Sequence, residues 1–381
     1  MNTVTSRLFI AATQQNDGKT TLSLGLFGAL RRALGRIGFI KPVGQRFVDV
    51  DGHKIDEDTV LIDQTYGIYA PLEAISPIAV EPDFTRRFIQ QANSDILVKR
   101  IQNSFDRAAW EKDFVIVEGT GHAGVGSVFD LSNARVAHLL GAQAILITQG
   151  GIGRPIDEIA LNAALFEKEG VKIVGVILNK VLPEKYDYVV DFARRGLARL
   201  GLELLGALPA DPVLSHPTLG QVSKAVKGDF INARSSSRRL ARRVLIGDMG
   251  TGHLLTQLSP GTLVITPGDR EDVVLAAVSL IRQHARGLCG IVLSSGLRAH
   301  ESVMKILLDS DLPAITSPLD SYTIASRIHS MTIKTLPGDT EKITRIQELT
   351  EKHVNIERLL EKLEAPKPGA TSAKSPAKDA E

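Results

Sequence analysis

The sequence predicts an α/β protein, in which a parallel sheet carries helices on both faces and a second, smaller α/β domain follows. Short apolar runs alternate with helix-length amphipathic stretches over the first half of the chain. Continuous apolar strands are typical of parallel sheets that are buried on both faces. The length of 381 residues is sufficient for two domains.

The first domain is predicted over residues 1–213, because strands and helices alternate regularly there. The apolar runs that predict buried strands are Arg7–Ala12, Ile37–Val43, Phe114–Val117, Ala144–Thr148, Ile173–Leu178 and Leu204–Leu208. The amphipathic stretches that predict helices are Thr20–Leu34, Pro155–Glu169 and Lys185–Leu200. Each of these helices is followed by a glycine, in the position where glycine commonly ends a helix.

The second domain is predicted over residues 214–338, with strands at Thr262–Thr266, Gly290–Ser294 and Ala314–Ser317. An Arg-rich stretch at its start is interpreted as a solvated helix face, although an acidic partner is an alternative. The arginines concerned are Arg234, Arg238, Arg239, Arg242 and Arg243.

An amphipathic helix is predicted over residues 339–364, and a tail rich in Pro, Ala, Lys and Ser over residues 365–381 is expected to be disordered. Apolar residues of the helix fall three and four positions apart, as in a short heptad seam. Its members are Ile346, Leu349, His353, Ile356, Leu360 and Leu363. The seam is compatible with a homodimer and equally with packing against its own domain.

Composition excludes several classes of function. The 45 Lys and Arg residues balance the 43 Asp and Glu residues, so no overall field attracts nucleic acid or an anionic membrane. The single cysteine, Cys289, excludes an intramolecular disulfide, and its apolar surroundings predict a core thiol. No segment approaches the roughly 20 apolar residues of a membrane span, so we expect a cytoplasmic protein.

A phosphate-binding loop is predicted directly after the first strand, where the sequence reads AATQQNDGKTT. Backbone N–H groups and a helix N-terminus bind phosphates, a lysine neutralises the outer phosphates, and a hydroxyl binds Mg²⁺. The predicted binding residues are Asp17, Gly18, Lys19, Thr20 and Thr21. The leading glycine of the GxxxxGK[ST] motif is replaced by Thr13. With this loop, the predicted sheet is of the P-loop NTPase type.

Three further groups are predicted at the same edge of the sheet, where ligands bind in folds of this kind. Glu118 ends the strand DFVIVE and is a candidate for binding the metal ion directly or orienting its water. Lys41 is a candidate for neutralising a phosphate or substrate anion. The acidic segment 49–63 is expected to supply one further candidate metal ligand from among Asp51, Asp56, Glu57 and Asp58, although most of its charges are expected to be solvated.

Asn179 follows the strand VKIVGVIL and is a candidate for reading a purine edge, since its amide both donates and accepts. The tetrapeptide NKVL has Leu182 where the guanine-reading NKxD pattern has aspartate, so adenine is favoured over guanine. An asparagine in a tight turn is the alternative.

Over residues 5–213 the sequence resembles dethiobiotin synthetase and the N-terminal region of long phosphate acetyltransferases. The resemblance is carried by KTT after a strand, IKPV, EDTVLI, VEGTG and LNK, in that order. It implies that Lys19 and Thr20 hold phosphate and magnesium, that Asp58 and Glu118 complete the metal site, and that Asn179 reads adenine. Gly44, Gln45 and Arg46 replace the small polar residues that follow LysProVal in the synthetase.

Residues 215–335 resemble the DRTGG domain that follows this region in long phosphate acetyltransferases. TPGDREDV at 266–273 and SSGL at 294–297 carry the resemblance, although Asp269 and Arg270 are followed by Glu271 rather than threonine. The acetyl-transferring domain is expected to be absent, so acetyltransferase activity is not implied.

The sequence favours a Mg²⁺-dependent ATP-binding protein, either a slow ATPase or a regulator in which nucleotide changes how the two domains meet. One alternative is an ATP-dependent ligase, of the dethiobiotin synthetase or cobyrinate amidase type, that activates a small carboxylate or carbamate through Lys19, Lys41 and Glu118. Another is a scaffold that binds no nucleotide. The expected partners are ATP with Mg²⁺, a small carboxylate or a protein, and a second copy of the chain in a homodimer, and neither nucleic acid nor a membrane.

Overall fold

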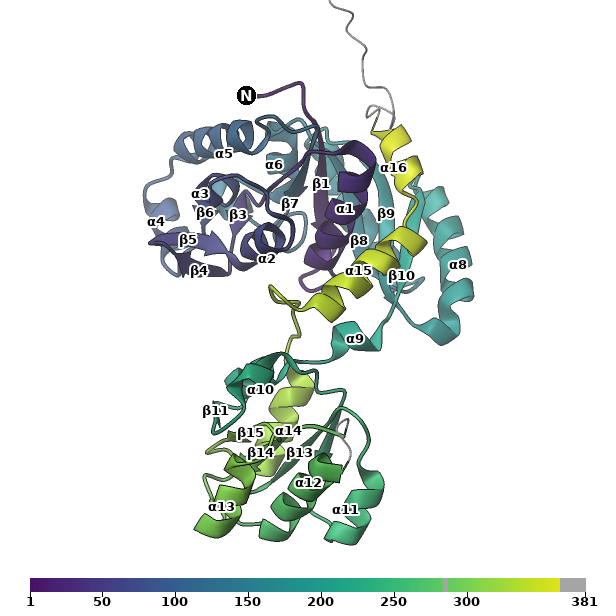
Figure 1. The fold of residues 1–381 in the computed structure, drawn as a ribbon. Helices are drawn as coiled ribbons and strands as arrows, with labels where there is room; N and C mark the ends of the chain where they lie inside the picture. Colours follow the sequence, from purple (N-terminus) through teal and green to yellow (C-terminus); the bar gives the residue numbers. More distant parts are fainter. Residues whose placement is uncertain (284–286, 364–381) are drawn as a thin grey trace, which may run out of the picture. The chain divides into compact units, whose positions relative to one another are not determined.

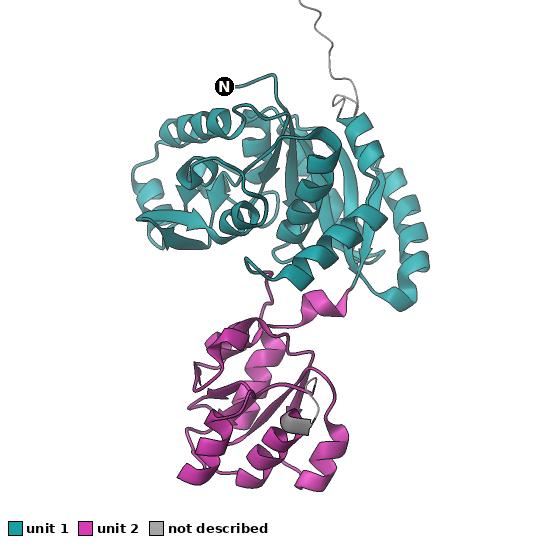
Figure 2. Cartoon of the chain, in the orientation of Figure 1, with its two compact units in different colours: residues 1–210, 336–381 teal, residues 211–335 magenta. Residues whose placement is uncertain are grey.

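The structure is a computed structural model that describes residues 1–283 and 287–363. It forms two compact units (Figure 2). Unit 1 comprises residues 1–210 together with the C-terminal segment from Leu336, and unit 2 comprises residues 211–335. The segment from Leu336, predicted as a separate element, is therefore part of unit 1. The predicted tail at 365–381 lies outside the described residues.

A six-stranded parallel sheet forms the centre of unit 1, as predicted (Figure 1). Its strands, in spatial order, are β10 (Leu204–Pro209), β9 (Ile173–Val181), β8 (Gln143–Gln149), β1 (Ser6–Ala12), β7 (Phe114–Glu118) and β2 (Ile37–Ile40). From β1 the chain goes to the edge strand β2, returns to β7 beside β1, and then crosses to β8, β9 and β10 on the other side. The connections therefore change direction at β1, and the switch point of the sheet lies beside it. Ligands bind beyond the carboxyl ends of strands at such a point.

Helices cover both faces of this sheet, because right-handed crossovers that run in opposite directions place their helices on opposite faces. One face carries α1 (Lys19–Leu34), and the other carries α6 (Asn133–Leu139), α7 (Arg154–Lys168) and α8 (Tyr186–Arg199). The glycines predicted to end three of these helices do so. Gly35, Gly170 and Gly201 have φ values of 94°, 70° and 70°, a backbone region that favours glycine.

A long insertion separates β2 from β7. Its elements are β3 (Val43–Gly44), β4 (Phe47–Val50), β5 (His53–Asp56), α2 (Glu57–Tyr66), α3 (Leu72–Ile75), β6 (Ile78–Ala79), α4 (Phe84–Gln90) and α5 (Ser94–Ala108). The predicted strand Ile37–Val43 is therefore wrong in its last three residues. Strand β2 ends at Ile40, and Val43 pairs instead with Ile78 in a separate two-stranded sheet, because Pro42 cannot donate to the ladder of the large sheet.

Two C-terminal helices replace the single helix predicted over 339–364. These are α15 (Thr340–His353) and α16 (Ile356–Lys362), and the chain between them is extended at Val354, which bridges to Gly206. The seam packs within unit 1, with Ile346 and Leu349 buried. Figure 1 shows α15 lying beside α1, and Tyr186 Oη lies 2.8 Å from His353 Nδ1.

Unit 2 is a second α/β unit, as predicted, with a five-stranded sheet in the order β11-β15-β14-β13-β12. Its strands are β11 (Asp229–Phe230), β12 (Arg243–Ile246), β13 (Thr262–Pro267), β14 (Leu288–Ser294) and β15 (Ala314–Thr316). Its helices are α9 (Pro212–Ser215), α10 (Leu219–Ala225), α11 (Thr251–Gln257), α12 (Glu271–Gln283), α13 (Glu301–Leu308) and α14 (Ser321–Ser330). Alternate residues of β13 pack into separate cores on the two faces, with Val264 on one side and Ile265 on the other.

The Arg-rich stretch does not form the helix face that the sequence predicts. Arg234–Arg238 form a short 3-10 helix, the chain is extended at Arg239, and Arg243 begins the parallel strand β12. Cys289 is buried in β14, as expected. Burial raises the pKa of its thiol to about 12. Within the described ranges 1–283 and 287–363, no helix has the length and apolar character needed to span a membrane.

Candidate functional site

The predicted phosphate-binding loop connects β1 to α1 at the switch point of the large sheet. Gly18 is the N-cap of α1, with a φ of 104° that an L side chain rarely adopts, and Lys19 opens the helix. The backbone N–H groups of the first helical turn have no partners within a helix, and the helix dipole favours an anion at this end. Strand, loop and helix thus have the arrangement that phosphate binding requires.

Thr13 and Asp17 stabilise the loop through hydrogen bonds of their buried side chains. Thr13 Oγ1 lies 2.9 Å from both Asp17 Oδ2 and Thr148 Oγ1. The same carboxylate of Asp17 accepts the N–H of Gln14 at 2.7 Å. Asp17 is 1% exposed, so its side chain lies inside the loop rather than facing solvent. Thr13, which replaces the first glycine of the motif, therefore has a part in holding this loop together.

Asn179 and Lys180, at the end of β9, support the loop from outside. Asn179 Nδ2 donates to the carbonyl of Asp17 at 2.8 Å, and its Oδ1 accepts the N–H of Lys180 at 2.9 Å. Lys180 Nζ donates to the carbonyl of Asn16 at 2.9 Å. The structure thus places the predicted base-reading amide against the loop backbone. Base reading by Asn179 stays a prediction.

Lys19 is buried, and its ammonium is bonded to backbone. Its Nζ donates to the carbonyl of Gly121 at 2.8 Å and to that of Gln14 at 3.4 Å. Burial, followed by repulsion from Lys41, lowers the pKa of Lys19 to about 8. The lysine of the loop is therefore tied to the segment that follows β7.

Lys41, the residue after β2, lies among carboxylates. Its Nζ donates to Glu118 Oε1 at 2.8 Å, pairs with Asp58 Oδ2, and lies 3.4 Å from Asp56 Oδ1. Thr20 Oγ1 donates to the same Glu118 oxygen at 3.3 Å. The predicted residues Thr20, Lys41, Asp58 and Glu118 are thus brought together from four segments of the chain.

Burial and charge act against each other in this cluster. Burial disfavours the ammonium of Lys41, but the carboxylates of Asp58, Glu118 and Asp56 outweigh it and raise the pKa of Lys41 well above its ordinary value. Burial raises the pKa values of Glu118 and Asp56, with the charge of Lys41 as the main opposing influence. The charged cluster exists because the lysine and the carboxylates stabilise one another in a buried place.

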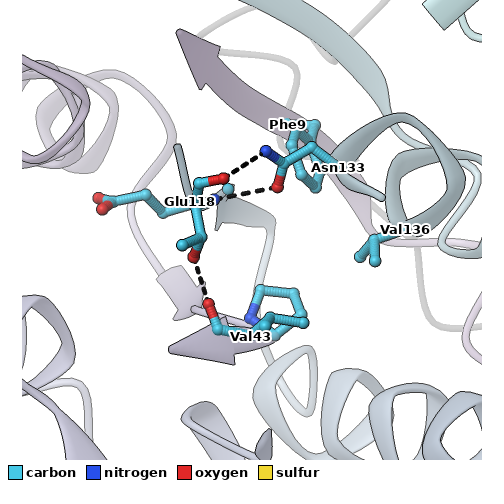
Figure 3. Close-up of a pocket in the computed structure, with 8 residues that line it drawn as sticks. Phe9, Val43, Glu118, Asn133 and Val136 are labelled. Atoms are coloured by element: carbon cyan, nitrogen blue, oxygen red, sulfur yellow. Dashed lines mark hydrogen bonds between the residues drawn. The ribbon is translucent and has the colours of Figure 1, made fainter. Parts of the chain in front are cut away.

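Figure 3 shows the Glu118 carboxylate pointing away from Phe9 and Asn133. Behind it, Asn133 accepts the N–H of Thr120 at 3.0 Å and donates to the Thr120 carbonyl at 2.7 Å. The space between these groups is too small to hold a water molecule, so it is not a ligand pocket. These bonds therefore fix the backbone of the segment 119–121, to which Lys19 is also attached.

The residues present fit a magnesium ion. Glu118 Oε2 is buried and has no hydrogen-bond partner, and oxygen atoms of carboxylates and hydroxyls are the ligands that Mg²⁺ prefers. Within the described part of the chain, no group of three His, Cys, Asp or Glu side chains forms a metal-binding cluster. Two carboxylates with the Thr20 hydroxyl are the predicted set, and such sites usually take remaining ligands from water and phosphates.

Sequence reasoning identified this cluster, with Asp56 among the four acidic candidates of segment 49–63, and missed two asparagines that support the neighbouring loops. Asp56 caps α2 by accepting the N–H of Asp58 at 3.0 Å, and it contacts Lys41. Asn133 and Asn162 bond backbone groups around the loops, and Asn162 accepts the N–H of Ala123 at 2.8 Å. No local pattern marks the two asparagines.

Two family models match the chain in succession. An AAA domain model, AAA_26, matches residues 6–218, and a DRTGG domain model matches residues 221–331. Among curated relatives, the phosphate acetyltransferase of Pseudomonas aeruginosa is 30% identical over 376 residues, covering 94% of this chain and 52% of the relative. That of Nitrosomonas europaea is 28% identical with the same coverage. The chain spans about half the length of the curated relatives it matches.

Solved structures are more distant. The MinC:MinD cell division complex of Aquifex aeolicus has a TM-score of 0.36 and 16% identity, covering 55% of this chain and 83% of that chain. The CBS and DRTGG domains of a Clostridium perfringens pyrophosphatase, complexed with diadenosine tetraphosphate, have a TM-score of 0.26 and 15% identity, covering 46% and 87%. These similarities are too low to support a functional assignment. The match over residues 6–218, together with the loop and sheet described above, shows that the chain belongs to the AAA_26 family of dethiobiotin synthetase-like P-loop domains, followed by a DRTGG domain.

Proposed function

We propose that the protein binds ATP with Mg²⁺ at the loop between β1 and α1 and responds to the nucleotide as a slow ATPase or regulator. The observation that supports this proposal most is the contact between Lys19 Nζ and the carbonyl of Gly121 at 2.8 Å. The lysine expected to neutralise the outer phosphates is bonded to the segment after β7, so a bound nucleotide would compete for it.

Each part of a nucleotide site has a candidate in the structure. The N-terminus of α1 offers backbone N–H groups to a phosphate, and Lys19 supplies a positive charge. Thr20, Asp58 and Glu118 would hold the magnesium ion, which when bound neutralises phosphate charge. Lys41 contacts the same Glu118 oxygen as Thr20 and would meet a phosphate or a substrate anion.

A response to nucleotide follows from the bonding of Lys19. When its ammonium turns to a γ-phosphate, the Gly121 carbonyl loses a donor and segment 119–126 is free to change. A ligand shifts a conformational equilibrium only through contacts that differ between the two states. The Lys19–Gly121 bond is such a contact, because an ammonium that moves toward a γ-phosphate leaves hydrogen-bond distance of the carbonyl. We propose that ATP, by binding, also changes the conformation of segment 119–126.

An ATP-dependent ligase is the second candidate, favoured by the burial of Lys41 beside Glu118. Lys41 is 4% exposed, and a buried ammonium next to a phosphate site can stabilise a phosphoryl group during transfer to a carboxylate or carbamate. The dethiobiotin synthetase and cobyrinate amidase types are the candidate reactions. Steady-state ADP release separates the two candidates. A requirement for a small carboxylic acid or amine favours the ligase, and hydrolysis without one favours the regulator.

Thermal unfolding tests the nucleotide proposal itself against a scaffold that binds none. A ligand that binds only the folded state stabilises it by an amount that rises with its concentration. We expect ATP with Mg²⁺ to raise the Tm of the full chain, GTP to raise it less, and Lys19→Ala to abolish both effects. An equal response of the parent chain and Lys19→Ala to ATP would place any binding elsewhere.

A further inference from the structure

The ammonium of Lys41 lies where three carboxylates converge, those of Glu118 and Asp56 buried and that of Asp58 partly exposed. Its Nζ is 2.8 Å from Glu118 Oε1, in contact with Asp58 Oδ2 and 3.4 Å from Asp56 Oδ1. Glu118 and Asp56 are 0% and 3% exposed at their side chains. Because the groups come from the ends of β2, β5 and β7 and the start of α2, their meeting is a property of the fold rather than of a local turn.

Two of these carboxylates belong to the predicted metal site. Glu118 Oε1 accepts hydrogen bonds from Lys41 Nζ and, at 3.3 Å, from Thr20 Oγ1. The other oxygen, Oε2, is buried without a partner. A buried carboxylate oxygen without a hydrogen bond is costly, and a cation beside it would remove that cost. Lys41 therefore occupies, through Glu118 Oε1 and Asp58 Oδ2, the two carboxylates that a divalent cation would also need.

Both cations cannot hold the same oxygens. A magnesium ion lies about 2.0–2.1 Å from its oxygen ligands, so its centre would fall within a few Å of Nζ, where two positive charges repel strongly in a buried place. The lysine stem has four carbons and can turn aside. The carboxylates are fixed by their elements, and Asp56 is held further through its N–H, which donates to Ser76 Oγ at 3.0 Å.

We propose that Lys41 is a built-in counter-ion of the acidic site, which a divalent cation displaces from Glu118 and Asp58 when it binds. The displaced ammonium is then available to the phosphate or substrate side of the site. Lys41 thereby opposes metal binding in the absence of nucleotide and favours the arrival of metal and polyphosphate together. The part that concerns phosphate rests on the proposed function, whereas the competition between Lys41 and the metal does not.

Manganese binding to the full chain without nucleotide tests the competition, measured as free Mn²⁺ by electron paramagnetic resonance. We expect Lys41→Met to bind Mn²⁺ at least about tenfold more tightly than the parent chain, because a competing buried charge is removed. The double variant Lys41→Met/Glu118→Gln should lose this gain. Lys54→Met is the matched control, since Lys54 forms an exposed pair with Glu81 at 2.8 Å, and it should bind like the parent.

If Lys41→Met binds Mn²⁺ no more tightly than the parent chain, the proposal is wrong.

A second measurement uses only the parent chain, so it does not depend on the folding of a variant. Acetylation of Lys41 by a small acylating reagent, followed by mass spectrometry, should become at least about fivefold faster with saturating Mn²⁺, since burial and ion pairing protect the amine, while Lys54 stays unchanged. Continued protection of Lys41 at saturating metal would equally contradict displacement. Failure of ATP binding, measured separately, would contradict the proposed function alone.

Discussion

Asn179 lies directly behind Gly18, and the two residues fit only because Gly18 has no side chain. The amide Nδ2 of Asn179 donates to the Asp17 carbonyl at 2.8 Å, and a Cβ built on Gly18 would lie 2.0 Å from that nitrogen. Gly18 also has a φ of 104°. The shape of the loop thus depends on a contact between residues that are far apart in the sequence.

Gly18→Ala is expected to distort the loop, because the new methyl group meets Asn179 and the backbone angle disfavours any side chain. We expect loss of detectable ATP binding and a lower free energy of unfolding, by about 2–4 kcal/mol. Gly170→Ala is the control, since φ there is 70° but no atom lies within 4 Å of its Cβ. It should lose only about 1 kcal/mol, measured by urea denaturation. Equal losses in the two variants would exclude a role for the contact.

Asn179→Ala distinguishes loop support from base reading. If Asn179 mainly holds the loop, its removal leaves the buried Asp17 carbonyl without its donor, at about 1–3 kcal/mol, and weakens ATP and GTP binding alike. If it reads adenine, the preference for ATP over GTP falls selectively. Calorimetry with both nucleotides measures the two effects. We expect a parallel loss, and a selective loss of ATP binding would restore the base-reading role.

The depressed pKa of Lys19 predicts that ATP binding weakens above about pH 8. Below that pH the ammonium is present in the folded protein, and it is lost as pH rises through the folded value. Phosphate binding favours the charged form, so binding near pH 8 should take up protons. Calorimetry in buffers of different ionisation enthalpy measures this uptake. Lys19→Arg retains its charge at all these pH values and should show no uptake, and a parent chain without uptake would contradict the assigned role.

The lowered pKa of Lys19 also makes the free energy of unfolding depend on pH, in the direction opposite to that of ATP binding. A lysine whose folded pKa is below its unfolded value of 10.5 destabilises the folded state at lower pH. This destabilisation is relieved as pH rises from about 8 toward 10.5, because the unfolded state then binds more protons than the folded state. Lys19→Met should therefore gain stability relative to the parent near pH 7, and less near pH 10. Urea denaturation at the two pH values checks the sign.

Glu118→Gln is expected to reduce the dependence of ATP binding on Mg²⁺, because it removes the charge that contacts Thr20 and Lys41. The ratio of ATP affinity in Mg²⁺ to that in EDTA should fall toward one. Glu81→Gln removes a carboxylate from an exposed pair with Lys54 and should leave the ratio unchanged. An unchanged ratio in Glu118→Gln would remove Glu118 from the metal site.

Close packing of α15 on α1 is tested by Gly25→Ala. A Cβ at Gly25 would lie 1.9 Å from Thr350 Oγ1, so the helices must separate, which we expect to lower the free energy of unfolding by about 1–3 kcal/mol. Gly252→Ala in α11 meets nothing within 4 Å and should be neutral or stabilising by up to about 1 kcal/mol. A neutral Gly25→Ala would show that α15 does not rest on α1 in solution.

The sequence predicted those elements whose signal is local. The strands of the large sheet are continuous apolar runs, and the loop has a glycine, lysine and threonine at fixed spacing before a helix. Strand β12 was missed because its residues follow a run of arginines that obscures the apolar segment Val244–Ile246. The interruption of the C-terminal helix was missed because Val354 is extended by pairing with Gly206, which a helical pattern cannot show.

In the candidate site, too, the sequence could place some residues, while the contacts between them depend on tertiary structure. Lys41 and Glu118 could be placed at one edge of the sheet, because strand ends in a parallel sheet share that edge, whereas Asp58 was singled out only by the family resemblance. That Lys41 contacts the carboxylates, and that Asp56 joins them, depends on how the insertion folds back over the sheet. The bond of Asn179 to the loop likewise depends on the neighbouring order of β8, β9 and β1.

Calorimetric titration of the full chain with ATP in Mg²⁺ buffer tests the central claim most directly. Lys19→Ala removes the loop ammonium, and Lys172→Ala, an exposed lysine at the start of β9, is the matched control. We expect saturable binding to the parent and to Lys172→Ala, with a loss of at least about tenfold in Lys19→Ala, since hydrogen bonds to charged groups are worth about 1.5–3 kcal/mol. ATP binding of equal strength in all three proteins, or in none, would contradict the claim.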